Sequence, residues 1–367
     1  MPFSFLLAGF IASFSALSYA ELSSKFPKSA GEAIYLEEAF SIKWISILAG
    51  WSIVIVGIVS VATLANGIVG YTQFFIGIND WIIKISLITI LFLVSIWGVK
   101  ESVFIASIIT VIELIGILLV IYYGFDNLLD INKKFDLLIP PINLNTFSLI
   151  TFGSFLSFYA YIGFEDMVNM AEEVKNPRIN LPISIIIVLI ITTILYILVA
   201  LVAVLSLPLE LLSSSNAPFI DLIKINSNFP VSVIVVISLI AVLNGMLIQI
   251  IMASRILFGM ANNNMAPQFF SYIYSRTKVP LYSSIFVFIL IILAALALPL
   301  VSLAKLTSTI ILIIFTAVNL SLVIIKRKNK KFTGLNDKKQ VSFPIIFPII
   351  GFLLFISFLI FQLKEFI

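Results

Sequence analysis

Long apolar segments recur along the whole of this 367-residue chain, and no other feature restricts its possible folds as strongly. A helix needs about 20 consecutive apolar residues to cross the hydrocarbon core of a bilayer. The chain is therefore predicted to be an all-α integral membrane protein with about ten transmembrane helices. The predicted spans are residues 3–20, 44–70, 82–97, 102–123, 146–171, 183–207, 231–254, 281–300, 303–325 and 343–363.

The composition fits a protein whose solvent is lipid. Hydrophobic residues make up 61% of the chain and charged residues only 11%, whereas a soluble domain carries about 25% charged residues. The chain has no cysteine and no histidine, which excludes disulfides, thiolate chemistry and most zinc and haem sites. We expect no enzyme activity, no metal, no cofactor other than a coupling proton, and no nucleic-acid partner.

Two local patterns decide where spans begin and end. Residues 3–20 have no basic residue before the apolar run and continue into Glu21 without a cleavage pattern, so this segment is interpreted as a membrane helix instead of a secretory signal. Pro299 and residues 302–305 divide an apolar run that is too long for one helix, because proline removes a backbone donor.

The distribution of lysine and arginine predicts the topology. If the ten spans alternate and the loop 21–43 is cytoplasmic, sixteen basic residues lie inside and six outside. Such a bias follows the positive-inside rule. We expect a multi-pass protein of the cell (plasma or inner) membrane whose basic loops, including 326–342, are cytoplasmic. No loop can hold a soluble domain, so residues 1–367 are predicted to form a single transmembrane domain.

The fifth predicted span combines a glycine with acidic residues inside the membrane. Gly163 is preceded by aromatic residues and followed by Glu165 and Asp166. Irregular backbone at membrane depth occurs only beside protein or a watery cavity, and broken helices form substrate sites in secondary transporters. The pattern predicts a break at residues 162–163. The alternative is an intact helix whose acids reach the cytoplasmic headgroups.

Other polar residues within the spans allow two interpretations. Glu113 lies in the middle of the span 102–123, where a charge costs about 3 kcal/mol on insertion scales. It could carry a proton, or it could be a neutral acid hydrogen-bonded to a neighbouring helix. Asn244 and Gln249 on the seventh span are interpreted as amides that pin helices together.

Three segments resemble the amino acid–polyamine–organocation permeases. Residues 19–32 (YAELSSKFPKSAGE) resemble the second helix of that family and the loop after it. Residues 158–182, from FYAYIGFE through EEVKNPRINLP, resemble its sixth helix and following loop. Residues 254–261 (SRILFGMA), followed by Pro267, resemble the end of its eighth helix. Their order and spacing agree across essentially the whole chain.

The resemblance implies the leucine-transporter architecture, in which two inverted five-helix repeats cross at the substrate through two broken helices. The fifth span would be the broken helix of the second repeat. The aromatic Tyr159 would close over the substrate, and the unwound stretch would hold the ammonium group through its carbonyls. Glu165 matches a glutamate just beyond the break, and Glu113 lies near a lysine position of proton-coupled relatives. The implied substrate-binding residues are Phe158, Tyr159, Ala160, Tyr161, Ile162 and Gly163.

The chain departs from the family pattern at its ends. Met1 aligns within the second helix, so the first helix, which is the other broken one, is expected to be absent, and the chain is expected to stop after the eleventh helix. Ala30 and Ala33 replace a glycine and an aromatic residue of the family loop.

These observations predict a secondary active amino acid transporter that works by alternating access, through proton symport or exchange. Two alternatives stay open. The chain could be a truncated permease without transport of its own, or a sensor or helper subunit that binds amino acids without moving them. The transported amino acid, the coupling ion and the oligomeric state are not predicted.

Overall fold

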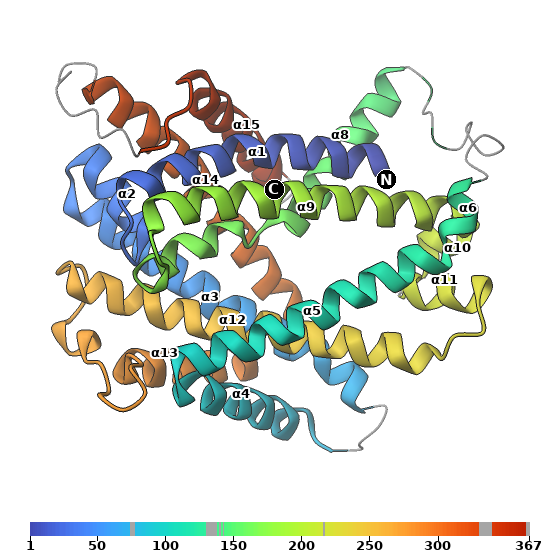
Figure 1. Cartoon of the computed structure of the whole chain (residues 1–367), viewed down its shortest axis with the longest axis horizontal. Coiled ribbons are helices and arrows are strands. Elements are labelled where there is room, and N and C mark those ends of the chain that lie inside the picture. The colour runs from blue at the N-terminus through green and yellow to red at the C-terminus, as the bar shows by residue number, and fades with distance from the viewer. Residues whose placement is uncertain are drawn as a thin grey trace. The chain divides into compact units, whose positions relative to one another are not determined.

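Helices form all the regular structure of the described residues, as Figure 1 shows for a computed structural model of the chain. The structure describes residues 1–73, 78–129, 138, 141, 143–215, 217–329 and 340–364. The helices are α1 (Pro2–Lys25), α2 (Gly31–Phe40), α3 (Lys43–Gln73), α4 (Asp80–Trp97), α5 (Val99–Tyr123), α6 (Phe125–Leu129), α8 (Leu144–Phe158), η2 (Tyr159–Tyr161), η3 (Phe164–Glu173), α9 (Pro177–Ser206), α10 (Leu209–Ser214), α11 (Pro218–Asn226), α12 (Val231–Asn262), η4 (Gln268–Ser271), α13 (Leu281–Ala297), α14 (Leu300–Asn329) and α15 (Ile346–Lys364).

Ten apolar helical segments correspond to the ten predicted spans. Among the described residues, eight segments are long and apolar enough to cross a membrane, and α13 and α15 are shorter apolar helices. The fifth of the eight, Thr146–Glu173, consists of α8, η2 and η3 in succession. The prediction of an all-α membrane protein with about ten spans is therefore confirmed.

The structure corrects several predicted boundaries. The helix α1 continues to Lys25 instead of 20, α9 begins at Pro177 instead of 183, and α12 ends at Asn262 instead of 254. Pro299 separates α13 from α14 as expected, but α14 begins at Leu300, so residues 302–305 are helical and do not belong to the division. The loop predicted at 21–43 contains the ten-residue helix α2. Its first six residues are buried, and packing against the protein stabilises a helix that would be too short to persist alone.

Part of the predicted topology lies outside the described residues. This applies to residues 330–339 of the basic loop and to Lys133 and Lys134 in the loop 124–145. The cytoplasmic placement of the basic loops therefore stays a prediction.

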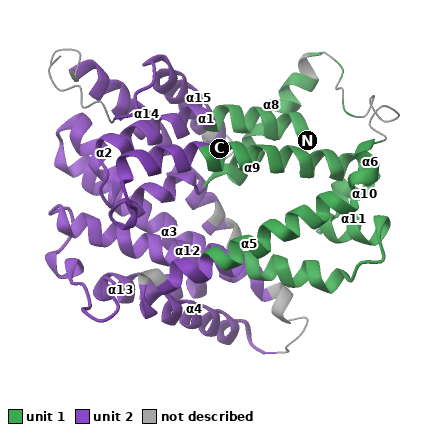
Figure 2. Ribbon diagram, viewed as in Figure 1, with its two compact units in different colours: residues 1–12, 107–162, 187–241 green, residues 13–106, 163–186, 242–367 purple. Residues whose placement is uncertain are grey.

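The described helices group into two compact units, shown in Figure 2. Unit 1 comprises residues 1–12, 107–162 and 187–241, and unit 2 comprises residues 13–106, 163–186 and 242–367. Each unit is assembled from three separate stretches of chain, so neither is a continuous domain. The single transmembrane domain stays a prediction.

Unit 2 is built around α3 and α14. The helix α14 packs against α15, α3 and α2, and α3 also packs against α13 and α4. In the most apolar part of α3, 61% of the residues are buried, compared with 17% in α4. Small and β-branched side chains of α3, such as Val54, Val61 and Ala62, are fully buried and allow this close packing.

Unit 1 has its own apolar core where α5, α9, α11 and α12 meet. The side chains of this core are Val120, Val202, Leu207, Leu222, Ile223 and Ile234. Tyr123 at the end of α5 adds an aromatic contact with Phe229, with ring centroids 5.2 Å apart. The short helix α11 lies in the loop predicted at 208–230 and is held by its buried Leu222 and Ile223.

A buried charge cluster joins the end of α1 to the end of α14. The Glu21 carboxylate is fully buried and lies 2.6 Å from the ammonium groups of both Lys25 and Lys326. It also accepts a hydrogen bond from the backbone N–H of Phe343, at 2.9 Å, just before α15. Two opposite charges and a backbone donor therefore satisfy a carboxylate that would be costly to bury alone.

We expect Glu21→Gln to lower the free energy of unfolding by about 3–5 kcal/mol, because the partly buried Lys25 and Lys326 would lose their shared, fully buried counter-ion. Reversible unfolding in mixed micelles measures this change. Glu210→Gln is the matched control, since Glu210 is exposed, and should change the free energy by less than about 0.5 kcal/mol. Equal stability of the two variants would contradict the role of the cluster.

Candidate functional site

The fifth span is interrupted in its middle. The α-helix α8 ends at Phe158 and tightens into the 3₁₀ turn η2. Ile162 then adopts an extended conformation, with φ −65° and ψ 132°, and Gly163 has φ 128° and ψ −19°. The chain resumes as the 3₁₀ segment η3. The backbone break predicted at residues 162–163 is therefore present, and an unbroken α-helix is not.

Glycine is needed at position 163 because of its backbone conformation, not because a side chain would lack room. Its φ of 128° lies in a region that residues with a Cβ rarely adopt. A Cβ built on Gly163 would meet no atom of the described residues within 4 Å. Any other residue would therefore strain the backbone even though a side chain has room.

Glu165 stabilises the backbone on the far side of the break. Its Oε2 accepts a hydrogen bond from the N–H of Gly163 at 2.7 Å. In a regular helix that N–H would donate to the carbonyl of Tyr159, which instead accepts from Ile162 at 3.3 Å. The carboxylate therefore replaces a helical hydrogen bond that the break removes. This is the location that the sequence predicted for Glu165, just beyond the break.

Two tyrosines hold the near side of the break within unit 1. Tyr161 donates from its hydroxyl to the carbonyl of Phe5 on α1, at 2.9 Å. Tyr196 on α9 donates to the carbonyl of Ala160, at 2.7 Å, and its ring lies 5.2 Å from that of Tyr161. The Ala160 carbonyl thus already has a donor. The sequence analysis did not identify Tyr196.

The predicted substrate residues do not share one face. Phe158 and Tyr161 are buried, with 0% and 4% of their surface exposed, so they belong to the packed interior. Tyr159, Ile162 and Gly163 are partly buried, and Ala160 is exposed. The break brings these six residues together through the backbone, and a binding role for them stays a prediction.

Beyond the break, η3 packs against α2 and buries a set of polar groups. The amide oxygen of Asn169 accepts from the N–H of Gly31 at 3.0 Å, which fixes the start of α2 on η3. Gln249 on α12 donates to the carboxylate of Asp166 at 2.7 Å. Gln249 was interpreted as an amide that pins helices, and the structure shows that its partner is one of the acids of the fifth span.

Glu32 is the acid that the sequence analysis missed. It lies in the first turn of α2 and is 1% exposed. Burial raises its pKa to about 8, because an ionised carboxylate is poorly stabilised away from water. A run of apolar residues directly after Glu32 (AIYL) was the available signal, since a solvent loop seldom carries such a run.

Glu113 belongs to a different compact unit from these acids. It is a partly buried residue of α5 and belongs to unit 1, whereas Glu32, Glu165 and Asp166 belong to unit 2. Its neighbours Val111 and Ile115 are about half exposed, at 56% and 49%. A role for Glu113 in coupling stays a prediction.

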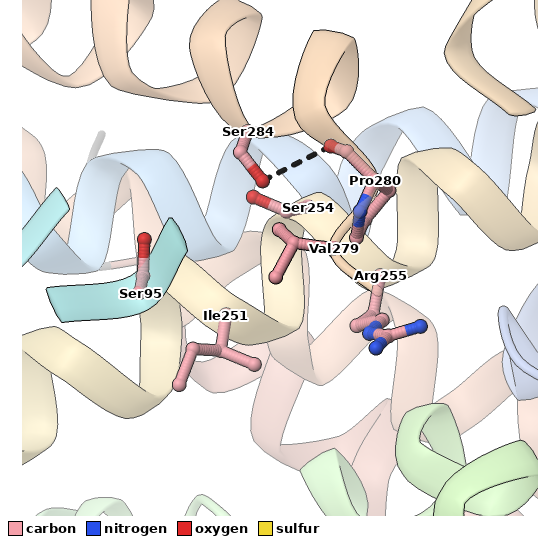
Figure 3. Close-up of a pocket in the computed structure, with 7 residues that line it drawn as sticks. All are labelled: Ser95, Ile251, Ser254, Arg255, Val279, Pro280 and Ser284. Carbon is pink, nitrogen blue, oxygen red and sulfur yellow. Dashed lines mark hydrogen bonds between the residues drawn. The ribbon is translucent and has the colours of Figure 1, made fainter. Parts of the chain in front are cut away.

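A small pocket lies beside Arg255 in the segment that resembles the family's eighth helix (Figure 3). Its volume of about 10 Å³ has room for about one water molecule. Arg255 forms an ion pair of 2.8 Å with Glu173, the last residue of η3. We therefore assign Arg255 to positioning η3 and do not treat the pocket as a substrate site.

Unit 1 contains a larger cavity of about 420 Å³. Its lining is almost entirely apolar and comes from the first residues of α1 and from α8, α9 and α10, with Leu138. Ser213 contributes the only hydroxyl side chain of the described lining, and none of the six predicted substrate residues takes part. A binding site for an amino acid needs groups for both its charges, which this lining does not provide.

Ten apolar helices, one of them broken and backed by buried acids, define a multi-pass membrane protein. A family model described as amino acid permease matches residues 1–366. The chain belongs to the amino acid permease family, as the resemblance of its three segments implied. Proteins of this family are permeases, which confirms that the chain is not an enzyme.

Individual relatives agree with this assignment. The chain is 29% identical over 345 residues to the Cationic amino acid transporter 3, mitochondrial, of Arabidopsis thaliana, with 89% of this chain and 56% of that protein covered. It is 25% identical over 359 residues to the Branched-chain amino acid permease BcaP of Bacillus subtilis, with 89% of this chain and 74% of that protein covered. The chain thus spans little more than half the length of the plant relative.

Among solved structures, the chain is similar to a Na⁺-coupled sialic acid symporter in its substrate-bound, outward-open state. The sequence identity is 14% and the TM-score is 0.49. The similarity covers 98% of this chain and 89% of the symporter.

We expect Gly163→Ala to destabilise the protein by roughly 1–3 kcal/mol, because alanine cannot adopt the glycine conformation without strain. Gly67→Ala is the matched control. Gly67 also has open space around its Cβ position, but it lies in the helix α3 with no positive φ. That change should be neutral or stabilising by up to about 1 kcal/mol. Unfolding in mixed micelles compares the two variants, and equal effects would argue against a strained break.

Proposed function

We propose that this protein is a secondary active amino acid transporter that works by alternating access, through proton symport or exchange. The observation that carries the proposal is the break at Ile162–Gly163 within an apolar span. Membrane transporters place such discontinuous helices at their substrate sites, where the released backbone groups bind charged parts of the substrate.

The polarity of the break suits the ammonium group of an amino acid. The C-terminal end of a helix carries partial negative charge, and α8 with η2 presents that end to the break. Tyr196 already donates to the Ala160 carbonyl. We therefore assign the ammonium group to the carbonyls of Tyr161 and Ile162, with the partly buried Tyr159 as the aromatic group that closes over the substrate.

The substrate class follows from the family and from the names of the relatives. One relative is named for cationic amino acids and another for branched-chain amino acids. We propose an amino acid substrate and do not choose between these two groups. The protein is proposed to act in the cell membrane with its basic loops in the cytoplasm, on the basis of the positive-inside bias of its sequence.

Uptake of labelled amino acids into proteoliposomes tests the proposal. We expect the full-length gene product to accumulate at least one amino acid from a panel of cationic and branched-chain members. Gly163→Leu should abolish uptake while the protein still inserts into the membrane, because leucine cannot adopt the φ of 128°. Gly67→Leu, at an open helical position, should retain uptake. Binding without accumulation would favour a sensor or helper subunit instead.

Glu113 provides a separate test of proton coupling. If it carries the coupling proton, Glu113→Gln should flatten the dependence of uptake on external pH, because glutamine cannot titrate. The wild-type protein and the variant are compared over the same pH series at equal amounts of inserted protein. An unaltered pH profile would assign Glu113 a structural role.

A further inference from the structure

The contact between α2 and η3 gathers three carboxyl groups of unit 2. Glu32 comes from the first turn of α2, and Glu165 and Asp166 come from the start of η3. They are close enough for their charges to repel one another, since Asp166 acts on both glutamates and Glu32 also acts on Glu165. Two of the three are almost completely buried, with Glu32 1% and Glu165 7% exposed.

Several polar atoms around Glu32 have no hydrogen-bond partner in the described structure. These atoms are Oε2 of Glu32, the hydroxyl of Tyr19 and the amide nitrogen of Asn169, and all three residues are at most 1% exposed. Tyr19 and Asn169 both face the Glu32 carboxyl group with donor groups that favour its charged form. A buried polar group without a partner costs about 1–3 kcal/mol. These buried polar atoms therefore converge on the Glu32 carboxyl group.

Aromatic rings close the cluster from α1 and α14. The ring of Tyr19 packs against those of Phe164 and Phe315, at centroid distances of 5.8 and 5.6 Å, and lies 6.4 Å from the ring of Tyr35. Tyr19 and Tyr35 are fully buried. Packed aromatic rings therefore surround the carboxyl groups, and an uncompensated charge is costly in such surroundings.

No positive charge compensates the three acids. Glu32, Glu165 and Asp166 form no ion pair in the described part of the chain. The nearby elements contribute cations that are engaged elsewhere or exposed. Lys25 of α1 and Lys326 of α14 bind Glu21, Lys328 of α14 binds the Ala39 carbonyl, Arg255 of α12 binds Glu173, and Lys43 of α3 is exposed.

We propose that Glu32 binds an exchangeable proton in this cluster, and that the proton holds α2 against η3. Protonation removes a negative charge that repels Asp166 and Glu165. After release, a third negative charge stands beside Asp166 and Glu165 with no cation to balance it, so α2 is pushed away from η3. A coupling of this event to transport rests on the proposed function.

The close fit between α2 and η3 makes the contact sensitive to such a charge. A Cβ on Gly31 would lie 2.7 Å from a methyl group of Val168, so glycine is needed for the approach. The Gly31 N–H also donates to Asn169. Glu165 belongs to the cluster and caps Gly163 at the break. A charge on Glu32 therefore acts on the residue that orders the break.

The pH dependence has a defined sign. Burial raises the pKa of Glu32 from 4.5 to about 8 in the folded state. The folded protein then holds this proton more tightly than the unfolded chain. The stability from this group is fully present below pH 4.5 and decreases as the pH rises, until the loss is complete above about pH 8.

Thermal unfolding of the purified protein in detergent, between about pH 5 and about pH 9, tests the proposal. We expect the Tm of the wild type to fall relative to that of Glu32→Gln by at least about 2 °C across this range. Glu38→Gln makes the same change at an exposed position of α2 and should follow the wild type. Parallel curves for Glu32→Gln and the wild type would overturn the proposal.

Two further comparisons keep the test decisive. Tyr19 favours the charged form of Glu32, so Tyr19→Phe should raise the pKa of Glu32 and extend the loss of Tm to higher pH. If Glu32→Gln does not fold, Tyr19→Phe tests the proposal in its place. A dependence of Tm on pH that is the same in Tyr19→Phe and in the wild type would overturn the proposal. The same series in Na⁺ and in choline buffers tests whether the cluster binds a metal cation instead of a proton. We expect the same Tm at alkaline pH in both buffers, and a higher Tm in Na⁺ would overturn the proposal.

The same variants separate this proposal from the proposed function. In proteoliposomes, Glu32→Gln should remove the stimulation of amino acid uptake by an imposed pH gradient, while Glu38→Gln should keep it. If the pH gradient still stimulates uptake by Glu32→Gln, the link between this proton and transport is overturned. The dependence of Tm on pH then still tests whether Glu32 binds the proton. If no form of the protein accumulates amino acids, the proposed function fails and the Tm curves still decide the proton site.

Discussion

Hydrocarbon offers no hydrogen bonds to a polypeptide, so every backbone group released by a broken span must find a partner within the protein. At the break of this chain, side chains provide two of those partners. Glu165 accepts from the Gly163 N–H, and Tyr196 donates to the Ala160 carbonyl. Without them the interruption would cost several kcal/mol for each orphaned group. The acid and the tyrosine are therefore part of what permits an irregular backbone here.

Using an acid as the cap has a consequence for the rest of unit 2. A carboxylate that must stay near Gly163 brings charge into a dry region, and Asp166 adds a second acid directly beside it. Neutral groups donate hydrogen bonds to these acids, as Gln249 does to Asp166, in place of lysine or arginine. Neutral donors satisfy hydrogen bonds without cancelling charge. The region therefore remains responsive to one more proton or one more charge, and Glu32 of α2 is positioned to supply it.

The sequence predicted the features that depend on local pattern. Span length, the division at Pro299 and the break at Gly163 follow from residue type and spacing, and the structure shows each of them. The surroundings of Glu32 could not be predicted in this way. The apolar run after Glu32 is a local signal of burial, but it does not identify the partner, because α2 folds back onto η3 through a contact between residues 138 positions apart. Gln249 links two elements, as an amide that pins helices would, but the sequence did not identify Asp166 as its partner.

The absence of histidine limits which side chains of this protein can bind and release a proton near neutral pH. Histidine is the side chain whose ordinary pKa lies near neutral pH, and this chain has none and no cysteine. Apart from the α-amino group, a side chain that titrates near neutrality must then be a carboxyl raised by burial or a lysine lowered by it. The partly buried lysines Lys25 and Lys326 are held by Glu21 in ion pairs. Carboxyl groups without a cation remain, and burial is the means by which this fold brings one of them, Glu32, into the neutral range.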